Sequence, residues 1–211
     1  MNHLKLAELK GTYHAIFSLG NLCLASIQLE KNGLRPYAGP IDWMASHHLP
    51  DISSLLRNRF SGFMDYNHLV VEGKASEALF LVKENYYNLY SNHDFFTHNN
   101  FPPHLAAYPE IKAKYDRRVN RFLEKMATSP KILFIRTEGT IEQAAELETA
   151  LRQIVAHDFN VLLINHHAVP YPIEVPCSLE KVCVLHFPNE DMWNANDHWW
   201  SNLLSEIHLV D

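Results

Sequence analysis

Short, uninterrupted runs of apolar residues recur along the chain and are separated by polar stretches. Four of them predict buried strands, at residues 14–19, 131–136, 159–165 and 182–187. Because these runs lack the polar alternation of a half-exposed strand, they suit a parallel sheet that is covered on both faces. The pattern therefore favours an α/β protein.

Apolar residues at helical spacing lie between these runs. They predict helices over residues 22–32, 49–60, 109–129, 140–158 and 196–207. Asn21 is the expected N-cap of the first helix, and Thr140 with Gln143 is expected to form a capping box at the fourth. The segment 69–90 is rich in β-branched and aromatic residues, which predicts a hairpin or meander.

The order of these elements predicts one fold class. We expect an α/β three-layer sandwich with a mostly parallel central sheet flanked by helices, built as a single domain over residues 1–211. A chain of 211 residues, of which 47% are hydrophobic and 20% charged, can bury a substantial core without disulfides or a metal.

Charge and cysteine usage limit the partners and the location. The net charge of −6 argues against electrostatic binding of nucleic acid, so we expect a small-molecule or peptide substrate. Three cysteines in different elements predict no disulfide framework and a reducing, cytoplasmic location. No apolar run reaches the length of a membrane span, and residues 15–27 read as strand plus helix rather than as a signal peptide. No cofactor is expected, and the oligomeric state stays open.

The stretch Ala15–Trp43 contains the strongest candidate for a functional site. Its strand ends near Ser18, a turn follows at Gly20 and Asn21, and Cys23 lies in the first turn of the predicted helix. Ligands in open α/β sheets bind at the carboxyl ends of strands, and a helix N-terminus lowers the pKa of a thiol. We therefore consider Cys23 a candidate nucleophile, and we expect Ser18, Gly20 and Asn21 to bind substrate. The alternative is a small, buried, unreactive cysteine.

The sequence GPIDW supplies two further candidates. Asp42 is flanked by apolar residues, and a buried carboxylate needs a partner. Its expected role is either to orient a base, or serve as one, or simply to cap the loop. Trp43, the next residue, is expected to contact substrate.

Several histidines could serve as the base that a thiol nucleophile needs. His93 is preferred because it lies in a long loop beside Asp94, which could orient it and contact substrate. The alternatives are His98, His104 and the pairs at 47–48 and 166–167. Neither an HExxH motif nor paired CxxC spacing occurs, so no metal site is expected.

Arginines provide candidate anion-binding groups. Arg136 ends the strand 131–136 at the edge where ligands bind, so it is a candidate for substrate binding. Arg117 and Arg121 lie four apart on the helix 109–129 and could together hold a carboxylate or phosphate. A solvated helix face explains these two residues as well.

Five motifs occur in the order SLGNLC, GLRPYAGPIDWM, NHDF, YDRRVNRF and KILFIR. This order resembles the bacterial domain of unknown function that is described as a putative papain-like cysteine peptidase, and the likeness runs from about Phe17 to Arg136. The resemblance implies a thiol-dependent hydrolase or acyl transferase with Cys23 as nucleophile, His93 as base and Asp42 as third member. Papain-like enzymes carry a mostly antiparallel sheet after the cysteine helix, whereas the second half of this chain predicts a parallel one.

Two other functions fit the sequence. One is an SGNH-like or Rossmann-like esterase or transferase that uses Ser18 with Asp197 and His198, although the Asp-x-x-His spacing of SGNH hydrolases is absent. The other is a non-enzymatic domain that binds an anionic sugar or nucleotide at the Arg136 end of the sheet. Neither GxGxxG nor a P-loop occurs, so a standard dinucleotide or NTP site is not expected.

Overall fold

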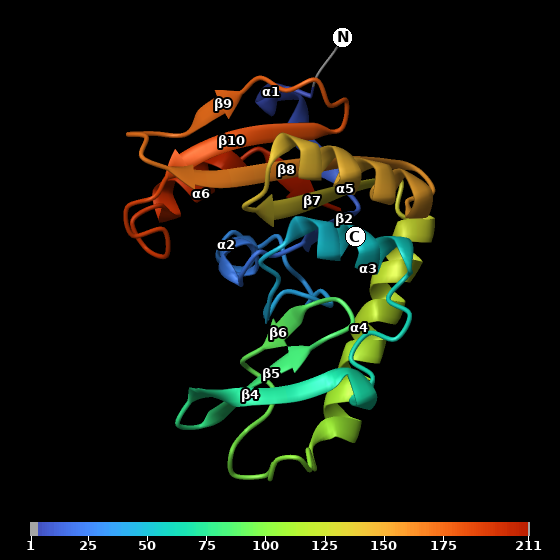
Figure 1. Ribbon diagram of the computed structural model, residues 1–211. Helices are drawn as coiled ribbons and strands as arrows, with labels where there is room; N and C mark the ends of the chain where they lie inside the picture. The colour runs from blue at the N-terminus through green and yellow to red at the C-terminus, as the bar shows by residue number, and fades with distance from the viewer. Residues whose placement is uncertain (1–3, 211) are drawn as a thin grey trace.

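A computed structural model describes residues 4–210 of the chain, and its largest sheet has five strands in the order β2-β7-β8-β10-β9 (Figure 1). Neighbours among the first four strands pair in parallel, and β9 pairs antiparallel with β10. The bounds are β2 Ala15–Ser18, β7 Lys131–Thr137, β8 Asp158–His167, β9 Ile173–Val175 and β10 Val182–Pro188. The four apolar runs are therefore confirmed as neighbouring parallel strands.

Helices follow three of the parallel strands: α2 (Leu24–Lys31), α5 (Ile141–Ile154) and α6 (Asp197–Leu204). The predicted capping box begins α5. Thr140 Oγ1 accepts from Gln143 N–H at 3.2 Å, and Gln143 Oε1 accepts from Thr140 N–H at 3.1 Å. This pair satisfies amides that a helix start leaves without partners. Within residues 4–210, no helix combines the length and the hydropathy needed to cross a membrane.

A separate antiparallel sheet lies below the first in Figure 1, with the strand order β3-β6-β5-β4. The last three of these strands confirm the meander that residues 69–90 predict. α3 and the 3₁₀ turn η1 lie between β3 and β4 in the chain. The bounds are β3 Met44–Ala45, α3 Leu49–Arg57, η1 Tyr66–His68, β4 Leu69–Ser76, β5 Leu79–Glu84 and β6 Leu89–Ser91.

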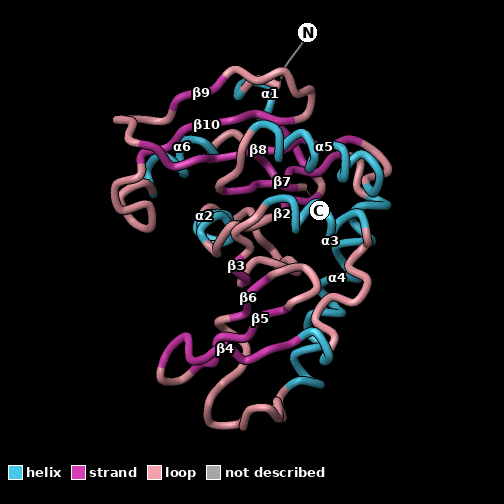
Figure 2. The backbone as a smooth tube through the Cα atoms, viewed as in Figure 1, coloured by secondary structure: helices cyan, strands magenta, loops and turns pink. Residues whose placement is uncertain are grey.

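Apolar side chains of the parallel strands divide between two hydrophobic clusters. Along β7, Phe134 belongs to one cluster, and its neighbours Leu133 and Ile135 belong to the other. The first cluster includes residues of α3, α4 (Tyr108–Thr128) and α5, and it extends to Val82 of the antiparallel sheet. The second includes residues of α2 and α6. One continuous cluster therefore connects both sheets, and α4 runs beside them in Figures 1 and 2.

This architecture confirms the α/β class and a largely parallel sheet. The three-layer sandwich and the single domain stay predictions, since the chain also builds the antiparallel sheet.

Helix α2 begins later than the sequence predicts. Its N-cap is Cys23, whereas Asn21 lies in the preceding loop because its backbone bonds to Thr137 and Ser46. Cys23 therefore stands immediately before the helix and not in its first turn.

Four short strands were not predicted, and one of them replaces the expected end of the last helix. β1 (Gly11–Tyr13) pairs in parallel with β11 (Ile207–Leu209), and α6 ends at Leu204. The other two are β3 and β9. Each has three residues or fewer, which is too short to produce a periodic pattern. The short helix α1 (Leu6–Leu9) was missed for the same reason.

Candidate active site at the start of helix α2

The loop between β2 and α2 is held on two sides. Asn21 N–H donates to Thr137 Oγ1 at 3.0 Å, at the end of β7. Asn21 O accepts from Ser46 N–H at 2.7 Å, just after β3. These bonds hold the backbone that leads to Cys23 against both sheets.

Cys23 is partly buried, and this burial affects the acidity of its thiol. Burial raises the pKa of Cys23, and a hydrogen bond from its own backbone amide lowers it by less. This corrects the expectation that the helix N-terminus would lower the pKa, because loss of thiolate hydration is the larger effect. The thiol therefore keeps its proton at neutral pH, and any nucleophilic role requires a base.

A candidate for this base lines the same cavity as Cys23, which has a volume of about 20 Å³. Cys23 lines one part of it, and His93, from the loop after β6, lines another. Trp43 and Met44 also contribute to the lining. Among the described residues no hydrogen bond joins Cys23 Sγ to the imidazole, so the pair shares a cavity without a direct contact of that kind.

Asp42 does not line this cavity, but a series of side-chain contacts connects it to His93. Its buried carboxylate accepts from Arg35 Nε at 2.7 Å and from Gly39 N–H at 2.8 Å. Arg35 lies over the Trp43 ring, 5.2 Å from its centroid. The Trp43 and His93 rings meet edge to face with their centroids 5.7 Å apart. Asp42 is thus linked to the imidazole through Arg35 and Trp43, without a hydrogen bond to it.

Asp94 anchors its loop to α4 and does not bond to His93. The buried carboxylate accepts hydrogen bonds from Ser91 and from Tyr115, the latter at 2.6 Å, and forms an ion pair with Lys114. Burial alone would raise the pKa of Asp94, but these donors outweigh burial and lower it. Asp94 therefore fixes the chain segment that carries His93.

Asp94→Asn is expected to lower the free energy of unfolding at pH 7 by about 3 kcal/mol, since it leaves Lys114 without its partner. Because the folded pKa of Asp94 lies below its ordinary value of 3.8, the carboxylate stabilises the fold above that value. The wild type loses this contribution as the pH falls through the lowered pKa. Urea unfolding at decreasing pH should therefore show a constant difference between the two proteins near neutral pH and a shrinking difference once the pH falls below 3.8.

Asp116→Asn is the matched control, because the Asp116 carboxylate pairs with Lys112 at 2.6 Å while half-exposed. It should cost less than about 1 kcal/mol. An Asp94→Asn protein as stable as this control would contradict the anchoring role.

Arg136 is fully buried, and its guanidinium contacts protein groups. Nη1 donates to Leu19 O at 2.8 Å and to Ser46 Oγ at 2.7 Å. Nη2 donates to Ser46 O at 2.6 Å, and Nε donates to Glu138 O at 3.0 Å. Burial lowers the pKa of Arg136 to about 9, so it stays charged at neutral pH. These donors hold the loop before Cys23 and are not open to a ligand in this structure.

Within residues 4–210, no hydrogen bond joins the side chains of Ser18, Asp197 and His198, the residues of the esterase alternative. Ser18 is 1% exposed, and its Oγ accepts from Gly20 N–H at 3.2 Å. Asp197 forms an ion pair with Lys31 at 2.8 Å, which ties α6 to α2. His198 Nδ1 lies 3.1 Å from a backbone carbonyl of its own segment.

The competing histidines serve other contacts. His166 Nδ1 lies 2.6 Å from Glu138 Oε1, and the His167 and His186 ring centroids are 4.0 Å apart. His47 is exposed and packs on a tyrosine of β6. None of these imidazoles lines the Cys23 cavity.

The three cysteines are free thiols with different environments. Burial raises the pKa of Cys183 to about 12, which leaves it unreactive. Cys177 Sγ donates to Val182 O at 3.3 Å. Of the three, Cys23 combines partial exposure with a histidine in the same cavity. Within residues 4–210, no group of three His, Cys, Asp or Glu side chains is placed to hold a metal ion.

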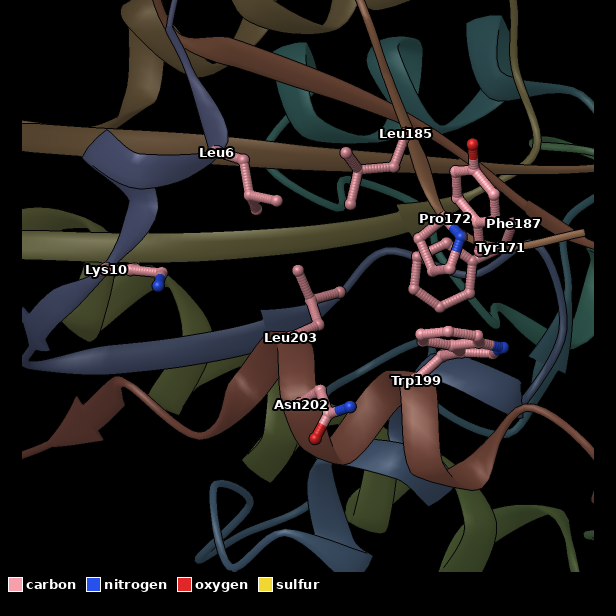
Figure 3. Close-up of a pocket in the computed structure, with 9 residues that line it drawn as sticks. All are labelled: Leu6, Lys10, Tyr171, Pro172, Leu185, Phe187, Trp199, Asn202 and Leu203. Carbon is pink, nitrogen blue, oxygen red and sulfur yellow. The ribbon is translucent and has the colours of Figure 1, made fainter.

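A second cavity, of about 400 Å³, lies between α1, β10, α6 and Tyr171–Pro172 (Figure 3). Its lining is largely apolar, and its polar members include Asn202 and Lys10, which pairs with Glu206. It shares no lining residue with the Cys23 cavity, so it belongs to a different part of the surface.

Sequence reasoning missed Arg35, Ser46 and Thr137, which hold the candidate site together. For Arg35 a weak signal exists, because it is a cation in the proline-bearing loop that also contains Asp42. The two hydroxyl residues carry no such signal, since their bonds to the Cys23 loop join distant segments.

Comparison with protein families shows which family the chain belongs to. A profile of the family described as "Putative papain-like cysteine peptidase (DUF1796)" matches residues 14–168. The chain belongs to this family. The matched range contains Cys23, Asp42 and His93, and it extends beyond the resemblance that ended near Arg136. The structure also contains both kinds of sheet: α2 is followed by the antiparallel one, and β2 joins the parallel one.

A relative among curated proteins is Uncharacterized protein R408 of Acanthamoeba polyphaga mimivirus, which is 26% identical over 134 residues. The match covers 57% of this chain and 60% of the relative, so the chain spans about three fifths of that protein's length. Because this relative is viral, a bacterial source of the family stays a prediction, as does a cytoplasmic location. No solved structure matches the chain significantly.

Proposed function

We propose that this protein is a thiol-dependent hydrolase or acyl transferase in which Cys23 is the nucleophile and His93 is the general base. The observation that carries the proposal is that both side chains line one small cavity, although they follow strands of different sheets. Membership of a family described as cysteine peptidases supports the same chemistry.

The reaction proceeds in two steps. Cys23 Sγ attacks a substrate carbonyl carbon while His93 accepts the thiol proton, and the imidazolium then protonates the leaving group as its bond to carbon breaks. Water, activated by the same imidazole, attacks the thioester and releases the acid and the free thiol. In acyl transfer another nucleophile takes the place of water.

The raised pKa of Cys23 determines when the proton moves. Since the resting thiol is protonated at neutral pH, His93 removes the proton as the substrate binds or reacts, and no stable thiolate–imidazolium pair precedes it. For this transfer the imidazole must come within hydrogen-bond reach of Sγ.

Backbone amides at the start of α2 are suited to stabilise the oxyanion. Within residues 4–210, the amides of Gly20 and Asn21 donate to other groups and the Cys23 amide contacts its own thiol, whereas the Leu22 amide donates no hydrogen bond. The positive end of the helix dipole adds to the stabilisation at this place. Of the four amides at residues 20–23, the Leu22 amide is therefore the one available to an oxyanion in this structure.

Acetylation by p-nitrophenyl acetate tests the proposal. The wild type should release nitrophenolate and form a thioester that mass spectrometry locates at Cys23, and Cys23→Ser should form none. At pH 7, His93→Gln should slow the acetylation by about a hundredfold or more, because the thiol then lacks its base.

His47→Gln is the matched control, because His47 is exposed and lies outside the cavity. It should leave the acetylation rate unchanged. Acetylation that bypasses Cys23, or that proceeds at the wild-type rate in His93→Gln, would overturn the proposed mechanism.

A further inference from the structure

A larger cavity adjoins the candidate site. It has a volume of about 390 Å³, and His93 lines it together with His98 from the same loop and with Lys114 and Arg117 of α4. Because His93 also lines the Cys23 cavity, the two spaces meet at the proposed base. This volume is large enough for a small ligand or a short peptide segment, since ligand sites typically measure about 300–1,000 Å³. We name this space the Arg117 cavity.

One positive charge in the Arg117 cavity has no partner. Lys114 is neutralised by the buried Asp94. Glu110 lies in the first turn of α4, where the positive end of the helix dipole compensates its carboxylate. Arg117 is exposed and forms no salt bridge with any residue of the described range 4–210. Its guanidinium is therefore available to a ligand.

Arg117 and Arg121 do not form the paired site that their spacing suggests. The Arg121 guanidinium lies over the Tyr37 ring, 4.9 Å from its centroid, and it does not line the cavity. A single guanidinium with a free fork is well suited to bind a carboxylate through two parallel hydrogen bonds.

We infer that the Arg117 cavity binds the segment of a peptide substrate next to the reacting bond and selects a segment that carries a carboxylate. This inference rests on the proposed function, since it takes His93 as the point where substrate passes from one cavity to the other. The carboxylate can belong to an acidic side chain or to the C-terminus of the peptide, and the same guanidinium chemistry recognises both.

Binding of three short peptides tests the inference. Acetyl-Ala-Ala-Glu-Ala-amide carries a side-chain carboxylate, acetyl-Ala-Ala-Gln-Ala with a free C-terminus carries a terminal one, and acetyl-Ala-Ala-Gln-Ala-amide carries none. NMR signals of the His93 and His98 imidazoles report on occupancy of the cavity. At low ionic strength at least one carboxylate peptide should bind about fivefold tighter than the neutral one.

Two variants of α4 show whether Arg117 causes the preference. Arg117→Gln should remove it, whereas Lys125→Gln should keep it, because Lys125 carries the same charge on the same helix but does not line the cavity. Equal binding of all three peptides, binding of none, or a preference that survives Arg117→Gln would each overturn the inference.

The test is separable from that of the proposed function. All titrations are repeated on Cys23→Ser, which cannot form a thioester, so the imidazole signals do not depend on reactivity. A carboxylate preference without acetylation of Cys23 supports the selectivity of the cavity and overturns the hydrolase. Acetylation without the preference supports the hydrolase and overturns the selectivity.

Discussion

Gly20→Ala is expected to lower the free energy of unfolding by about 4 kcal/mol or more, the largest loss from one methyl group that this structure indicates. A Cβ at this position would lie 2.2 Å from Ser46 Oγ and 2.8 Å from Arg136 Nη1. Neither atom can retreat easily, because these two groups bond to each other at 2.7 Å. The backbone angle φ of +88° adds strain for any residue with a side chain.

Gly33→Ala provides the matched control for this prediction. Gly33 also has a positive φ, of +70°, but a Cβ there would meet no atom within 4 Å. Its replacement should cost only the backbone strain, about 1 kcal/mol. Chemical unfolding of both variants measures the difference. Equal losses would show that the close approach of the guanidinium to Gly20 is not a constraint.

Arg136→Met is expected to lower the free energy of unfolding by about 4 kcal/mol, the second largest effect. The variant keeps much of the side-chain volume but leaves the carbonyls of Leu19 and Ser46 without their buried donors. Arg136→Lys should recover only part of the loss, because an ammonium cannot reproduce the planar fork that contacts both segments. Urea unfolding at neutral pH measures both variants.

Arg57→Met is the control for the loss of an arginine. Arg57 is exposed and donates one hydrogen bond, of 3.3 Å, to Glu146 O. Its replacement should change the free energy of unfolding by less than about 1 kcal/mol. If Arg136→Met were equally mild, the buried guanidinium would not support the Cys23 loop.

Local pattern was sufficient for the elements that are long and periodic. The runs that became β7, β8 and β10 are apolar on both faces, and the Thr140–Gln143 capping box lies entirely within four residues. The hydrophobic pattern did not predict short strands that pair with segments far away in the sequence. Ile207 reads as the end of the last helix, but residues 207–209 pair with β1 and form a strand.

The candidate site also has features that the sequence predicts and features that it does not. Cys23 was predicted from its place after a strand and a glycine turn, and the Cys23 cavity does contain His93. The partners of Asp42 and Asp94 were not predictable, because a carboxylate flanked by apolar residues reveals that it needs a partner but not which one. The direction of the Cys23 pKa shift was also missed, since burial depends on residues far along the chain.

The contacts of Arg136 affect how an inactive variant must be interpreted. Its guanidinium bonds to Leu19, shortly before Cys23, and to Ser46, shortly after Trp43. It therefore sets the spacing between the two walls of the cavity while touching neither reacting group. Loss of turnover after a substitution at this position reports a displaced geometry, and only a variant that keeps its unfolding transition can reveal a chemical contribution.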